Sequence, residues 1–157
     1  MRSEECGTRN VQVRSEECGT RNVQARSEEC GTRNENLRAR TKAFALDVIR
    51  LVENLPRTQT SGVIAKQLLR SGTSVGSNYL AACRAKSRAD FVAKMAIVEE
   101  EADESRYWME LLMEAGIVRR EDVMGLMAEA DELVAIAIAS AKTARGGSRQ
   151  GGVRNAK

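Results

Sequence analysis

The side chains best suited to chemistry include a run of acids in the second half of the chain. Five carboxylates fall within six positions, at 99–101 and 103–104, in a stretch with helical periodicity. Di-iron bundles bind metal through helix carboxylates, but their sites also need Glu-x-x-His pairs, and this chain contains no His. The run therefore predicts a charged helix face that is solvated or lies between subunits. A sharper alternative is that one of these acids meets Arg70 inside the bundle and offsets the desolvation of its guanidinium. A carboxylate-based metal bundle is a distant alternative.

The residues required for the common catalytic mechanisms are absent. Ser and Cys are present, but no His can act as their base. The chain lacks both a G-x-x-x-x-G-K-[ST] phosphate loop and a G-x-G-x-x-G motif. We therefore expect a protein without enzymatic activity, bound cofactor or metal.

Basic residues occur in short groups that could contact phosphate. One group, Arg84 to Arg88, lies at the turn between two predicted helices, another is at the start of the last predicted helix, and a third lies in the tail. Topology places the first two at opposite ends of a bundle, so we expect two small clusters; solvated helix ends are the simpler alternative. The candidate nucleic-acid contacts are Arg84, Lys86, Arg88, Arg119, Arg120, Arg145 and Arg149.

Net charge is unevenly distributed. Residues 38–142 carry 15 Lys and Arg against 15 Asp and Glu, whereas residues 143–157 carry four cations and no acid. A sequence-independent attraction for nucleic acid is therefore expected in the tail or in local patches. No apolar run approaches the ~20 residues that a membrane span needs, and the N-terminus is polar. We expect a cytoplasmic protein.

The N-terminus consists of three copies of a twelve-residue unit beginning RSEECGTRN, over residues 2–37. The unit offers little apolar surface to bury, so residues 1–36 are predicted to be disordered or weakly helical. Its Cys residues, at 6, 18 and 30, lack the close spacing of a zinc site. Cys83, on a predicted helix, is expected to be buried. The Gly-rich basic tail, residues 145–157, is also predicted to be disordered.

Residues 37–144 are predicted to form an all-α, antiparallel up-down-up-down four-helix bundle. The expected helices cover 36–54, 60–85, 88–115 and 120–144, with caps at Thr58–Ser61, Ser87 and Gly116. The predicted inward-facing residues are Phe44, Val48, Leu51, Val52, Leu55, Ile64, Leu68, Val75, Tyr79, Phe91, Met95, Val98, Ala102, Met109, Leu112, Val123, Met127, Ala130, Val134, Ile138 and Ala141.

The run SGTSVGS in the second predicted helix combines small and polar residues. Its small side chains predict close approach by a neighbouring helix. Arg70, Ser71, Ser74 and Asn78 stand where a plain bundle would place Leu or Ala, and Arg70, Ser74 and Asn78 are the candidate polar core.

The segments QLLRSGTSVGSNY and FVAKMAIVEEEADESRYWMELL resemble the four-helix-bundle proteins encoded in rRNA intervening sequences, over roughly Leu37–Ala141. That family is related to the accessory variability determinant of diversity-generating retroelements. Its members commonly have Arg, Ser and Asn at the positions of Arg70, Ser74 and Asn78, but often a Glu shortly afterwards, where this chain has Ala81 and Ala82. The resemblance implies a ring-like homopentamer and, for the retroelement branch, RNA and a reverse transcriptase as partners.

Two functions follow. The first is a non-enzymatic homo-oligomeric bundle that binds RNA or an RNA-processing partner. The alternative is a purely structural or protein-interaction oligomer. Both functions agree with the presence of apolar residues outside the predicted inward-facing positions, since such residues indicate a second packing surface. These are Ile49, Leu69, Leu80, Ile97, Trp108, Leu111, Leu126 and Ile136.

Overall fold

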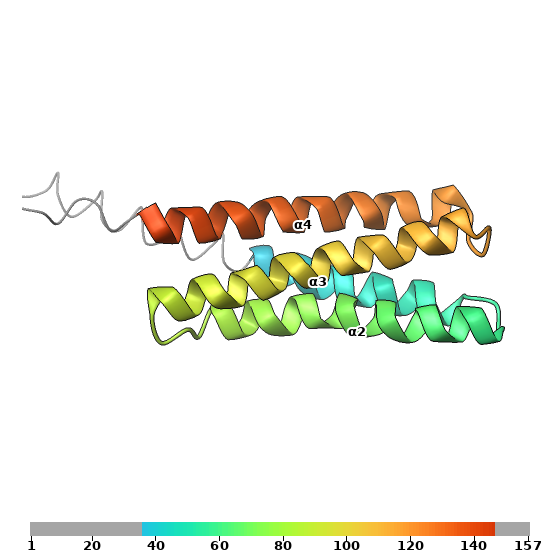
Figure 1. The fold of residues 1–157 in the computed structure, drawn as a ribbon, viewed down its shortest axis with the longest axis horizontal. Helices are drawn as coiled ribbons and strands as arrows, with labels where there is room; N and C mark the ends of the chain where they lie inside the picture. Colours follow the sequence, from blue (N-terminus) through green and yellow to red (C-terminus); the bar gives the residue numbers. More distant parts are fainter. Residues whose placement is uncertain (1–35, 147–157) are drawn as a thin grey trace, which may run out of the picture. The chain divides into compact units, whose positions relative to one another are not determined.

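The described part of the chain is entirely helical. The computed structural model describes residues 36–146, which all belong to the second of the chain's two compact units, beginning at Asn36. Four helices pack together: helix 36–53, α2 (Gln59–Ala82), α3 (Arg88–Glu114) and α4 (Arg120–Gly146) (Figure 1). The predicted all-α four-helix bundle is confirmed. The repeats, their cysteines and most of the basic tail lie outside the described residues.

Helix starts follow the predicted capping residues. The Thr58 hydroxyl accepts a hydrogen bond from the Ser61 amide at 3.1 Å, and the Ser87 hydroxyl accepts one from the Asp90 amide, also at 3.1 Å. Such caps satisfy amides that have no partner within the first helical turn. Both predictions of an N-cap are confirmed.

The turn between α2 and α3 is longer than predicted. Helix α2 ends at Ala82 rather than at residue 85. The Asp90 carboxylate accepts a hydrogen bond from the Lys86 amide at 2.9 Å, so the start of α3 fixes the chain just before Ser87 and ends α2 early. As a result, Cys83 caps α2 and is exposed, so the prediction that it is buried is wrong.

Gly116 ends α3 in the predicted C′ position. Its φ is 67°, in the left-handed region, and the Ile117 amide donates to the Leu112 carbonyl at 2.9 Å while the Gly116 amide donates to the Met113 carbonyl at 3.0 Å. This pair of bonds is a Schellman motif, which reverses the chain toward α4.

Replacing Gly116 with Ala should therefore destabilise the bundle. The substituted Cβ would meet no neighbour, so the expected loss of about 1 kcal/mol comes from the backbone conformation alone. Urea denaturation measures it. Gly125→Ala is the control, because Gly125 is helical with equally open surroundings and should gain stability. Equal effects at the two positions would contradict this reading.

The core follows the predicted stripes, with one correction in α4. Phe44, Leu68, Met95, Met109 and Leu112 are the largest of the predicted core side chains that are fully buried. Several predicted members are only half-buried: Leu51, Val52, Leu55, Ile64, Phe91 and Val134. In α4, Leu133 and Ala137 are buried and Ile138 is 46% exposed, so the inward placement of Ile138 was wrong.

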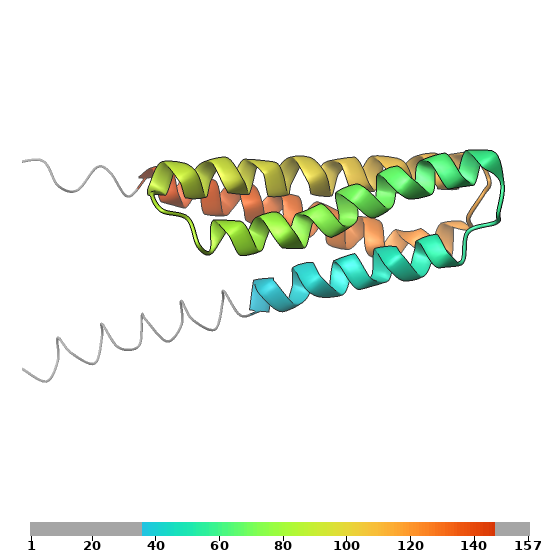
Figure 2. The same cartoon turned by 90° about the horizontal axis from the view of Figure 1, so that it is seen from below.

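The small residues of α2 allow close helix packing, as predicted. A Cβ built on Gly72 would lie 2.8 Å from both methyl carbons of Val48, and one on Gly76 would lie 3.4 Å from the Thr41 carbonyl oxygen. Helix 36–53 therefore rests directly against the backbone of α2 (Figure 2).

The connections define two ends of the bundle. The α2–α3 turn and the C-terminal end of α4 share one end (Figure 1). The connections from helix 36–53 to α2 and from α3 to α4 share the other (Figure 2). This arrangement decides which charged residues can act together.

Candidate nucleic-acid interface

The first basic group lies in the α2–α3 turn. Arg84, Lys86 and Arg88 are all exposed. The Arg84 Nε donates to the Leu80 carbonyl oxygen at 3.3 Å. Within the described residues none of these three side chains forms an ion pair. They are therefore available to bind an anion.

The end of α4 adds cations to the same end of the bundle. Arg145 lies in the last turn of α4 and Lys142 one turn earlier, and both are exposed. Because α3 and α4 are antiparallel neighbours, these residues approach the start of α3, where Lys94 also lies. Arg149 lies outside the described residues.

Among the residues that the structure describes, one acid belongs to this region. Asp90 accepts the Lys86 amide and pairs with the Lys94 ammonium at 3.3 Å. The amide hydrogen bond, together with the nearby lysines, lowers the pKa of Asp90 below its ordinary value. We call this region the basic end; it comprises Arg84, Lys86, Arg88, Lys94, Lys142, Arg145 and Asp90, six cations against one anion.

The other predicted cluster is neutralised by its own helix. Arg119 bonds Asp122 through two nitrogens, at 3.0 and 2.8 Å, and its third nitrogen lies 3.1 Å from Glu121. The hydrogen bond to Asp122 raises the pKa of Arg119 further above its ordinary value, and the same pair lowers that of Asp122. Arg120 is exposed beside these acids. The structure places Arg119 and Arg120 opposite the basic end, so they do not form one surface with it.

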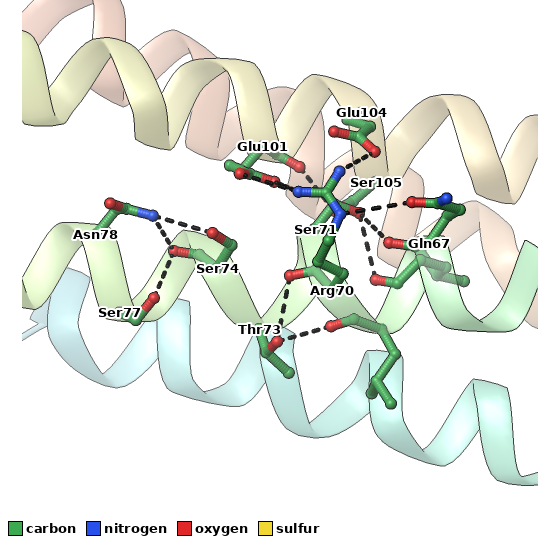
Figure 3. Close-up of polar contacts among 12 residues, drawn as sticks. Gln67, Arg70, Ser71, Thr73, Ser74, Ser77, Asn78, Glu101, Glu104 and Ser105 are labelled. Carbon is green, nitrogen blue, oxygen red and sulfur yellow. Dashed lines mark hydrogen bonds and ion pairs between the residues drawn. The ribbon is translucent and has the colours of Figure 1, made fainter.

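Arg70 contacts the acidic run of α3, but at the surface. Its guanidinium pairs with Glu104, and its Nη1 lies 3.4 Å from Glu101 (Figure 3). Glu104 also accepts the Trp108 indole N–H at 2.9 Å. The Arg70 side chain is 53% exposed, so the predicted acidic partner is present while the predicted location inside the bundle was wrong.

The hydrogen bonds of the Ser74 and Asn78 side chains lie within α2. The Asn78 amide donates to the Ser74 carbonyl at 2.9 Å and to its hydroxyl at 3.0 Å (Figure 3). Both residues are half-buried. With Arg70 they line one side of α2 but do not form one core network.

Ser71 stood out in the sequence as a polar residue at a core-like position, but its buried partner, Ser105, was not predicted. The Ser71 and Ser105 hydroxyls lie 2.9 Å apart between α2 and α3, and both residues are fully buried. One hydroxyl donates to the other, which in turn donates to a carbonyl of its own helix. Ser71 lies in the quoted motif beside Arg70, but nothing in the sequence identifies Ser105 as its partner.

The family model described as 23S rRNA-intervening sequence protein matches residues 34–139. The chain belongs to this family. Among solved structures, this family member matches a protein of unknown function from the S23 ribosomal protein family of Bacteroides thetaiotaomicron, with 35% sequence identity and a TM-score of 0.65. The match covers 69% of this chain and 97% of that one. No curated protein matches the chain significantly.

The five acids of the run in this intervening-sequence protein differ in whether they have a basic partner. Glu101 and Glu104 face Arg70, whereas the other three acids form no ion pair with residues of the described range. Over residues 36–146, no three His, Cys, Asp or Glu side chains are grouped so that they could hold a metal ion. None of the described helices is long and apolar enough to span a membrane.

The Arg70–Glu104 contact predicts a pH dependence of stability. The hydrogen bond from Arg70 lowers the pKa of Glu104 in the folded protein. The ion pair therefore stabilises the fold fully above the unfolded-state pKa of Glu, about 4.3, and this stabilisation is lost as pH falls through the folded-state pKa. Arg70→Met should therefore lower the stability of the protein only slightly at neutral pH, since the pair is largely exposed. Urea denaturation at several pH values should show the difference from the native protein vanishing in acid. A difference that persists unchanged would contradict the electrostatic origin.

Proposed function

We propose that this intervening-sequence protein is a non-enzymatic, self-associating bundle that binds RNA through its basic end. The observation that carries the proposal is the six-to-one excess of cations there, with five of the cations making no ion pair within the described residues. Bringing phosphates to such a surface releases counterions, which favours binding without any sequence preference. We assign the protein no catalytic role, because the chain contains no His and no nucleophile–base pair was found in its sequence.

Exposed apolar side chains support self-association. Of the eight apolar residues outside the predicted stripes, Leu69 and Ile97 are exposed and the others are half-buried. Apolar side chains left open on several helices favour burial against another chain. The large exposed apolar residues are Leu46, Val63, Leu69, Ile97, Tyr107, Met124 and Ile138.

A salt series on the full chain tests the proposal. The probe is a labelled single-stranded RNA of mixed sequence, about 20 nucleotides long, followed by fluorescence anisotropy. Contacts to about five phosphates give a log–log slope near −3.5, so affinity should fall about 100-fold between ~50 and ~200 mM salt. Removal of residues 147–157 should reduce the slope without abolishing binding. No binding at the lowest salt would overturn the proposal.

The alternative, a purely structural or protein-interaction oligomer, is favoured by the same exposed apolar residues. It predicts a different response, because apolar assembly barely depends on salt. Sedimentation over the same salt range therefore separates the two functions: unchanged assembly without RNA binding supports the alternative.

A further inference from the structure

Acids line the seam between α3 and α4. Glu99, Asp103, Arg106 and Glu110 follow one another at spacings of four, three and four residues, so they lie on one side of α3. The Arg106 Nε lies 2.9 Å from the Asp131 carboxylate, so this side of α3 adjoins α4. We call these residues the acidic seam. Its single base, Arg106, is shared by Asp131 and Glu110, whereas Glu99 and Asp103 pair with no cation in the part of the chain that the structure describes.

Two exposed apolar side chains lie on the same seam. Tyr107 follows Asp103 by four residues on α3 and is 51% exposed. Ile138 on α4 is 46% exposed, and it lies seven residues from the ion pair across the seam, as Glu99 does on α3. Seven residues make nearly two turns and the helices are antiparallel, so Ile138 comes out on the seam at the level of Glu99. The seam therefore offers acids and apolar surface together.

The segment that follows α4 carries the complementary charge. Residues 147–157 contain three cations, at positions 149, 154 and 157, and no acid. They continue from Gly146, at the basic end, whose cations repel them. The acidic seam begins at the level of Ile138, eight residues or about 12 Å from Gly146 along α4. A segment of this charge is therefore repelled by the basic end and attracted by the seam next to it.

The length of this segment fits the seam. Two adjacent glycines, at 146 and 147, can adopt the backbone conformations that a reversal of the chain requires. Arg149 lies three residues beyond the end of α4, a span of up to about 10 Å before its long side chain is counted, and Arg154 lies eight residues beyond it, up to about 28 Å. Along α4, the level of Glu99 is about 12 Å from the helix end and Asp131 about 22 Å. The two arginines can therefore reach the acids of the seam.

We infer that residues 147–157 fold back and dock on the acidic seam, with Arg149 near Glu99 and Arg154 near Asp103. The exposed tyrosine of the seam offers a ring face on which a guanidinium is stabilised. Because the segment is tethered to α4, its effective concentration at the seam is about millimolar. Exposed ion pairs are individually weak, so the docked segment leaves the seam when phosphates compete for its arginines.

Limited digestion of the full chain with trypsin tests the docking. Mass spectrometry follows cleavage after residues 149 and 154, relative to cleavage after residues 9 and 21 of the N-terminal repeats in the same digest. Glu99→Gln together with Asp103→Asn should speed the tail cleavage at least about threefold, because cleavage follows the undocked population. About 0.5 M salt should do the same to the native chain. The two substitutions remove like charges from one side of α3, so the variant should fold at least as well.

Glu53→Gln together with Glu132→Gln is the matched control and should leave the cleavage ratio unchanged. Both acids are exposed, and their replacement changes the net charge by the same amount. Glu132 lies off the seam, on the side of α4 where it helps to raise the pKa of Arg40. The inference is overturned by equal acceleration in the two variants, by no acceleration in the seam variant, or by a ratio that changes with protein concentration. The last would assign the seam to the tail of a second copy. No RNA is present, so failure of the docking is distinguishable from failure of the RNA site.

Discussion

Replacing Arg84, Lys86 and Arg88 with Glu together should lower the affinity for single-stranded RNA by at least about 100-fold at ~0.1 M salt. Each phosphate contact on a single strand contributes a slope of about −0.7, so three contacts account for about two powers of ten at that concentration. The reversed charges would also repel the strand. Fluorescence anisotropy with the labelled RNA measures the change. We expect an effect of this size because these three cations have no acidic partner within the described residues.

A charge-matched variant at the opposite end controls for net charge. Arg57, Arg119 and Arg120 are exposed, and their replacement by Glu changes the total charge by the same amount. Its effect on affinity should be several-fold at most, because Arg119 is already paired with Asp122 and Glu121. If both triple variants lose the same affinity, binding depends on overall charge and the basic end has no special role.

The largest effect on stability is expected at Gly72. Gly72→Leu should destabilise the bundle by more than about 3 kcal/mol, and Gly72→Ala by about 1–2. Even a Cβ would lie 2.8 Å from both methyls of Val48, which is fully buried and, as a β-branched residue, has little rotamer freedom. The gain in helix propensity, about 1 kcal/mol, offsets only part of this clash.

A double-mutant cycle checks that Val48 is the cause. Val48→Ala removes the two methyl groups, so Gly72→Ala should cost less in its presence, with a coupling of about 0.5–3 kcal/mol by urea denaturation. Gly125→Ala, where the Cβ meets nothing, should instead stabilise the protein. Additive effects of Gly72→Ala and Val48→Ala would contradict the proposed contact.

Much of the fold follows from local sequence. Thr58, Ser87 and Gly116 carry their own capping chemistry, so the positions of three helix ends could be predicted from residue type alone. The α4 core was harder because residues 133–139 are all apolar, and a continuous apolar run has no periodicity to separate Ala137 from Ile138.

The site depends on contacts that no local pattern contains. The pairing of Arg70 with Glu104, and of Ser71 with Ser105, requires the register between α2 and α3, which is set by packing between residues 34 positions apart. Likewise, the addition of Lys94 and Lys142 to the basic end follows from the antiparallel arrangement. One contact at the basic end does have a local pattern: Asp90 and Lys94 are four residues apart on α3, the spacing at which helical side chains pair.

Ultraviolet cross-linking of the labelled RNA to the full native chain, followed by peptide mapping, would locate the RNA site on the bundle. Among described residues, we expect the cross-links to concentrate in 83–94 and 139–146, which form the basic end, and to disappear at high salt. Cross-links concentrated instead around 54–58 and 115–122, at the opposite end of the bundle, would contradict this assignment of the site.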